Sequence, residues 1–176
     1  MIGCAFTLMR DPRAKVVIVT DGAKGADPKR PRLSRRSVAR ERKRESTEAL
    51  GSLGIRDVSF LDLTEDAIRP LEVIRQLNRI TRKGARVEAI YAHQVNDEHI
   101  DHRTVGVIGL VLAAEWDCPI WQYPVAPVHR NRKPDRRVTA TRQEKQRKRD
   151  LLRTYRTQWH VTKDYVQAPE VFWRGL

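Results

Sequence analysis

The chain of 176 residues contains only two cysteines, Cys4 and Cys118, and they do not form a CxxC pair. This scarcity excludes a disulfide framework and a thiolate zinc knuckle, and it fits a reduced compartment. The sequence also lacks an apolar run of membrane-spanning length and the basic-then-apolar start of a signal peptide. We therefore expect a cytoplasmic protein that has no membrane partner.

Acidic residues are few relative to basic ones, and the formal net charge is +13. The positive charge gathers in residues 29–44 and 130–153. A basic surface of this kind can bind nucleic acid by releasing counterions. It is equally typical of solvated helix faces in an arginine-rich protein. No RNA-binding aromatic signature or zinc-finger spacing accompanies the charge, so a nucleic-acid partner is possible but is supported by no motif.

Short apolar runs alternate with helical patterns along the chain, which predicts an α/β fold with a mostly parallel sheet covered on both faces. We expect one domain over residues 1–176, with a basic loop at 128–139 and a tail that packs back on the body. The predicted strands lie at 15–20, 58–63, 87–92 and 119–123, and the predicted helices at 2–9, from Ser34 or Ser37 to about 53, from Asp66 to about 84, at 104–116 and at 141–159.

The segment His99-Ile100-Asp101-His102 lies where a predicted strand gives way to a predicted helix. Ligands of parallel α/β sheets bind beyond the carboxyl ends of the strands, and Asp21 also follows a strand end. Two imidazoles and a carboxylate at such a junction predict a metal and acid/base site, although a catalytic zinc needs three protein ligands and a water. Asp21 can support that site or simply form a turn. The other histidines near or beyond it, His93 and His129, are predicted to be surface residues.

Several local signatures follow one another in a characteristic order over nearly the whole chain. They are Ile2-Gly3-Cys4 with Thr7-Leu8, Thr20-Asp21-Gly22, Arg42 with Glu45, Leu53-Gly54-Ile55, Phe60-Leu61-Asp62, His99-Ile100-Asp101-His102, and Lys148 with Leu152, Tyr155 and Gln158. This combination resembles the PIG-L/LmbE-type de-N-acetylases, zinc hydrolases that remove acetyl groups from substrates containing N-acetylglucosamine.

The resemblance implies a Rossmann-like three-layer sandwich that acts on a small sugar conjugate. His102 corresponds to a zinc ligand, and His99 to the imidazole that stabilises the oxyanion or protonates the leaving amine. Asp101 would orient His99 and favour its charged form, or it caps the following helix. Arg42 corresponds to a substrate-contacting arginine paired with Glu45, or the two form an ordinary surface pair one turn apart.

One family segment is absent from the printed sequence. In the family, a first strand ending in Ala-His-Pro-Asp-Asp-Glu precedes the Ile-Gly-Cys helix and supplies two zinc ligands and the general base. We therefore expect an N-terminally truncated member with its first strand missing, in which His102 alone remains to bind Zn²⁺ and activity is lost. The full-length form is then a zinc-dependent amidohydrolase. The alternatives are a non-catalytic binding protein derived from the family and a basic nucleic-acid-binding protein.

Overall fold

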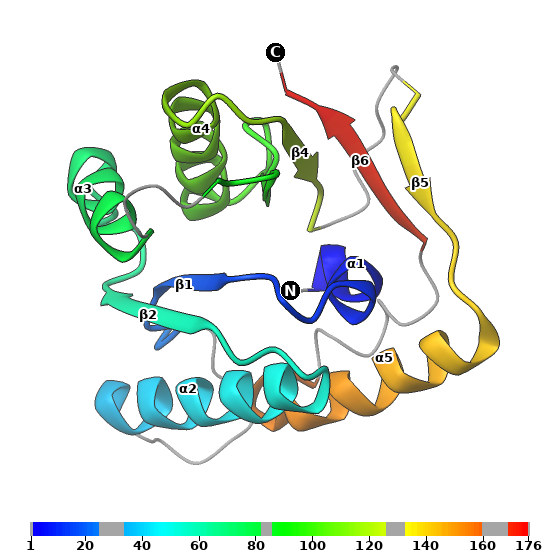
Figure 1. Cartoon of the computed structure of the whole chain (residues 1–176). Helices are drawn as coiled ribbons and strands as arrows, with labels where there is room; N and C mark the ends of the chain where they lie inside the picture. The colour runs from blue at the N-terminus through cyan, green and yellow to red at the C-terminus, as the bar shows by residue number, and fades with distance from the viewer. Residues whose placement is uncertain (1, 25–33, 82–85, 126–132, 160–168, 176) are drawn as a thin grey trace. The chain divides into compact units, whose positions relative to one another are not determined.

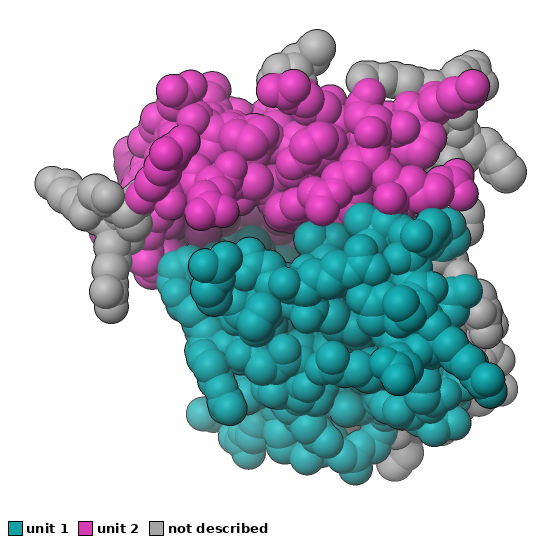
Figure 2. All heavy atoms as spheres, turned by 45° about the vertical axis from the view of Figure 1, so that its right-hand side comes forward, with its two compact units in different colours: residues 1–65, 138–169 teal, residues 66–137, 170–176 magenta. Residues whose placement is uncertain are grey.

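The computed structural model describes residues 2–24, 34–81, 86–125, 133–159 and 169–175. The chain forms two compact units, which Figure 2 shows in different colours. Unit 1 comprises residues 1–65 and 138–169, and unit 2 comprises residues 66–137 and 170–176.

Unit 1 is built on a pair of parallel strands whose β-branched residues favour extended backbone. Strand β1 runs along β2, and the long helices α2 and α5 pack against each other (Figure 1). The elements of this unit are η1 (Ile2–Cys4), α1 (Ala5–Arg10), β1 (Val16–Thr20), α2 (Arg35–Ser52), β2 (Val58–Leu63), α5 (Arg142–Thr154) and η2 (Arg156–Gln158).

Capping residues mark both ends of α2 and the start of α5. The Ser34 side chain accepts a hydrogen bond from the Ser37 backbone at the start of α2, and Gly54 follows its end with a φ of +84°. Helix α5 begins with a capping box between Thr141 and Glu144. The apolar sides of α2 and α5 then share a core made of Ala49, Leu50, Leu53, Ile55, Leu151, Leu152 and Tyr155.

Unit 2 is a four-stranded sheet with strand order β3-β4-β6-β5. Strands β3 and β4 are parallel, whereas β6 runs antiparallel to β4, so this sheet is mixed. Helix α4 packs on β3 and β4, and Gly109 permits this close approach to Ala92 and Ile120. The elements are α3 (Pro70–Ile80), β3 (Ile90–His93), α4 (Ile100–Glu115), β4 (Ile120–Tyr123), β5 (Arg136–Val138) and β6 (Glu170–Arg174).

The structure confirms the predicted α/β class and departs from the predicted elements in two regions. Strands β5 and β6 occur where the sequence predicted a loop and an unassigned tail, and the Asp135 backbone N–H donates to Phe172 O. The last predicted helix is also shorter, because α5 ends at Thr154. The backbone N–H of Thr157, in the following turn, donates to the buried carboxylate of Glu45 at 2.8 Å.

Candidate functional site

His99 is the N-cap of α4, in the segment that the sequence singled out. Its Nδ1 accepts a hydrogen bond from the Asp101 backbone N–H at 3.2 Å. An accepting Nδ1 carries no proton, so this contact corresponds to the neutral ring with its proton on Nε2. The exposed His99 ring therefore offers an N–H donor beside the positive end of the helix dipole.

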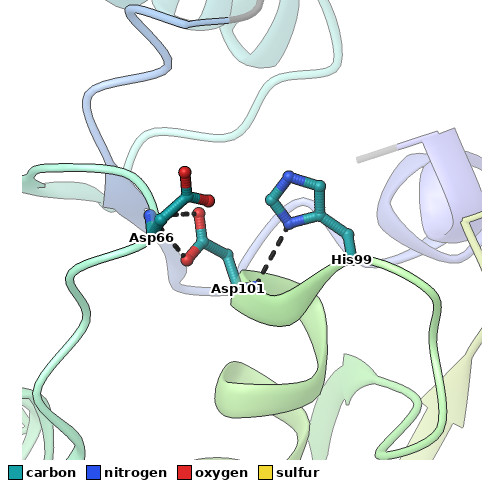
Figure 3. Close-up of side chains that lie close together, drawn as sticks. All are labelled: Asp66, His99 and Asp101. Carbon is teal, nitrogen blue, oxygen red and sulfur yellow. Dashed lines mark hydrogen bonds between the residues drawn. The ribbon is translucent and has the colours of Figure 1, made fainter.

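Asp101 is buried in the first turn of α4, and its carboxylate contacts the loop before α3. Both of its oxygens accept from the Asp66 backbone N–H, at 3.0 and 3.2 Å (Figure 3). Ligand atoms of Asp66, His99 and Asp101 all lie within 4.8 Å of one another, which makes the three a possible metal-binding group. It is the backbone N–H of Asp101, rather than its carboxylate, that donates a hydrogen bond to His99. The N-cap of α4 is His99, so the prediction that Asp101 caps this helix is wrong.

His102 lies in the first turn of α4 and pairs with a carboxylate that the sequence did not single out. Its Nδ1 is 2.9 Å from Oδ1 of Asp97, whose side chain is 6% exposed. Burial by itself raises the pKa of Asp97, but hydrogen bonds from the His99 backbone N–H and the His102 ring bring it below its usual value. A signal was present, since an Asp two residues before His99 falls in the same strand-to-helix loop.

His93 ends β3 and packs between two other rings. Its ring stacks on His102 with centroids 4.3 Å apart and lies 4.9 Å from the ring of Tyr123. Its Nδ1 is buried and has no hydrogen-bond partner in the part of the chain that the structure describes. Burial, followed by the proximity of His102, holds the pKa of His93 well below its usual value, so the ring is neutral at neutral pH. The prediction of a surface histidine is therefore wrong for His93.

Arg42 belongs to unit 1, where its guanidinium packs against the turn after β1. A Cβ at Gly22, which has a φ of +67°, would lie 3.0 Å from Nε of Arg42. Both Nε and Nη1 of Arg42 are buried without a hydrogen-bond partner among the described residues, and burial lowers the pKa of Arg42. The Glu45 carboxylate accepts hydrogen bonds from the backbone and side chain of Thr157, and it acts on Arg42 only as a nearby charge that opposes the lowering of its pKa.

Asp21 directly follows β1 and forms the turn that carries Gly22. Its backbone N–H donates to Leu63 O at 2.8 Å, and its carboxylate accepts from the Ala23 backbone N–H at 3.1 Å. Turn formation therefore accounts for the contacts of Asp21.

The predicted site residues fall into two groups. Unit 2 gathers His99, Asp101 and His102, and adds Asp97 and His93 to them. Unit 1 places Arg42 beside the turn that contains Asp21. His129 and residues 128–132 of the basic loop predicted at 128–139 lie outside the described residues. Within the described ranges, no helix is both long and apolar enough to cross a membrane.

Two comparisons with known proteins found matches. The model of the GlcNAc-PI de-N-acetylase family, PIG-L, matches residues 2–113. A search of curated proteins found no match. Solved structures are similar over nearly the whole chain, although the identities are low.

The N,N'-diacetylchitobiose deacetylase from Pyrococcus horikoshii is 20% identical with a TM-score of 0.81, and the match covers 99% of this chain and 78% of that one. The conserved protein TT1542 from Thermus thermophilus is 18% identical with a TM-score of 0.71, covering 99% and 89% of the two chains. GalB, the 4-carboxy-2-hydroxymuconate hydratase from Pseudomonas putida KT2440, is 15% identical with a TM-score of 0.79, covering 99% and 89%. Because a deacetylase and a hydratase share this fold, the fold alone does not decide the reaction.

Proposed function

This chain belongs to the GlcNAc-PI de-N-acetylase family, and we propose that it removes the acetyl group from an N-acetylated amino sugar or a related conjugate. The observation that carries the proposal is the family match over residues 2–113, because that range contains the His99–His102 segment. Because a hydratase also shares this fold, the fold does not distinguish the two reactions, and the family match is the stronger support for a deacetylase.

The reaction is hydrolysis of an amide. Water adds to the acetyl carbonyl carbon and negative charge develops on the carbonyl oxygen; the C–N bond then breaks, the nitrogen takes a proton, and acetate leaves. His99 is suited to the developing charge, since its Nδ1 accepts from Asp101 and its Nε2 can donate. Donors aimed at an oxyanion typically lower the barrier by about 3 kcal/mol.

His102 is the residue that the proposal assigns to a zinc ion. Its Nδ1 is paired with Asp97, so Nε2 keeps a lone pair and fits one nitrogen ligand of a metal ion. A catalytic zinc takes three protein ligands, and the group formed by Asp66, His99 and Asp101 in the described part of the chain does not include His102. The described residues therefore do not place His102 in a three-ligand zinc site, and the roles proposed here are those of the side chains alone.

Arg42 is proposed to bind the substrate. Two of its buried guanidinium nitrogens have no acceptor within the described ranges, which is costly unless a ligand supplies oxygen atoms. Sugar hydroxyls and phosphate oxygens are both acceptors of that kind.

The test is acetate release from N-acetylglucosamine conjugates by the protein expressed from its own gene. We expect His99→Ala to lower kcat about 100-fold, because a positioned donor is lost. Glu98→Gln is the matched control, since Glu98 is an exposed carboxylate in the same loop, and it should leave the rate unchanged. Binding of the sugar without acetate release would contradict catalysis and favour a non-catalytic binding protein.

A further inference from the structure

We propose that Asp97 is a positioning residue that fixes the proton of the His102 ring on Nδ1 and holds His99 in place with the same carboxylate. The consequence for catalysis rests on the proposed function, whereas the tautomer itself follows from the contacts alone. Asp97 lies in the loop between β3 and α4, within unit 2.

A single oxygen of Asp97 contacts both histidines. Oδ1 lies 2.9 Å from Nδ1 of His102 and accepts from the His99 backbone N–H at 3.1 Å. An ionised carboxylate can only accept, so the ring nitrogen facing it must carry the proton. The proton on Nδ1 leaves Nε2 of His102 unprotonated, and that nitrogen can then bind a cation or accept a proton.

The loop that carries Asp97 is itself held in place. The Asp97 backbone N–H donates to Gln94 O at 3.2 Å, and its carbonyl accepts from Nη1 of Arg103 at 3.0 Å. The same Arg103 nitrogen also donates to Glu98 O at 2.9 Å. These hydrogen bonds attach the loop to Arg103 of α4, and they limit how far the Asp97 side chain can move.

Stacking on His93 also restrains the orientation of the His102 ring. The His93 ring lies almost parallel to it, at 19° with centroids 4.3 Å apart. The hydrogen bond to Asp97 lies near the plane of the His102 ring, whereas the stacking contact lies on its face, so the two contacts restrain different motions. Without them, the ring is expected to favour the form with the proton on Nε2, as free histidine does.

The test is a nitrogen-15 NMR spectrum of the histidine side chains, recorded on the protein expressed from its own gene at a pH where the rings are neutral. We expect wild type and the control Glu98→Gln to carry the His102 proton on Nδ1, and Asp97→Ala to move it to Nε2. Asp97→Asn keeps an oxygen acceptor and should restore the Nδ1 form. If Asp97 were only structural, its substitution would destabilise the fold but would not move the His102 proton from Nδ1 to Nε2.

Two results would overturn the inference: a wild-type His102 with its proton on Nε2, or a proton that stays on Nδ1 in a folded Asp97→Ala protein. The wild-type spectrum is decisive even where the alanine variant does not fold. Acetate release on the same samples separates this inference from the proposed function. A tautomer that moves as expected in a protein that releases no acetate supports the role of Asp97 and contradicts the deacetylase proposal.

If both hold, Asp97→Ala should lower kcat at least 10-fold with little change in KM, because a partner of this kind orients an imidazole rather than binds substrate. An unchanged kcat in that variant would contradict the positioning role.

Discussion

Arg42 places a charged side chain in unit 1, and two of its buried nitrogens find no hydrogen-bond acceptor among the residues that the structure describes, which is costly for stability. Because the positive charge of Arg42 lies near the buried Glu45 carboxylate, we predict that Arg42→Met lowers the free energy of unfolding by about 2 kcal/mol. The same change should raise KM for the acetylated sugar about 10-fold, because the acceptor oxygens of the substrate lose their partner.

Urea unfolding and steady-state kinetics measure the two effects. Arg40→Met is the matched control, because Arg40 is an exposed residue of the same helix, and it should change neither quantity. A less stable Arg42→Met protein with an unchanged KM would show that Arg42 is structural.

The sequence predicted some residues of the site and missed others for a physical reason. His99, Asp101 and His102 could be found because they are close in sequence and lie at a strand-to-helix junction. The roles of Asp97 and His93 depend on how the loop after β3 folds over the start of α4. Such contacts are set by loop conformation rather than by spacing along the chain, and the hydrogen bonds of Glu45 with Thr157 were missed for the same reason.

At the scale of elements, the site depends on how closely α4 approaches β3. A Cβ at Gly106 would lie 2.6 Å from His93 O and 3.1 Å from the backbone nitrogen of Val95. Because those atoms belong to the backbone, we predict that Gly106→Ala lowers the free energy of unfolding by about 2 kcal/mol.

Gly51→Ala is the control, since Gly51 lies in α2 with open space around it, and it should stabilise by about 0.5–1 kcal/mol. Urea denaturation compares the two variants. Equal effects of both substitutions would mean that α4 does not pack against the end of β3 as described.

The start of α5 provides a prediction about pH. The Arg10 guanidinium donates to both carboxylate oxygens of Glu144, at 2.8 and 3.0 Å, and lowers the pKa of Glu144 to about 2. The unfolded value is about 4.3, so the ionised form stabilises the fold above that pH. This contribution decreases as the pH falls from about 4.3 and is lost below about 2.

Glu144→Gln should therefore be less stable than wild type at pH 7, by about 1 kcal/mol, since Arg10 is 48% exposed and solvent weakens the pair. The difference should disappear as the pH approaches 2. Thermal unfolding from pH 7 to 2 measures it, and a constant difference over that range would exclude the ion pair as its cause.

The elements themselves were largely predictable, because apolar periodicity and capping residues are local signals. Ser34, Gly54 and the β-branched run of β1 mark boundaries that the structure confirms within one or two residues. Strands β5 and β6 were missed because they are short and carry charged residues, and they become strands only through their pairing in the sheet of unit 2.

At the scale of the whole molecule, the sequence predicted the α/β class but not the grouping of strands into two sheets. Period-two and period-3.6 patterns identify strands and helices, whereas strand neighbours depend on tertiary contacts. The net charge of +13 did not predict the function, since a basic surface suits many anionic partners. The family match over residues 2–113 gives the most direct indication of the chemistry, because the family is described by its reaction, de-N-acetylation.

The central claim is amide hydrolysis, and isotope labelling tests it most directly. The protein expressed from its own gene is incubated with an N-acetylglucosamine conjugate in water enriched in heavy oxygen, and the products are weighed by mass spectrometry. We predict labelled acetate and an unlabelled free amine, with about 100-fold less of both from His99→Ala. A labelled sugar product without acetate, as a hydratase would give, or equal yields from His99→Ala, would contradict the account.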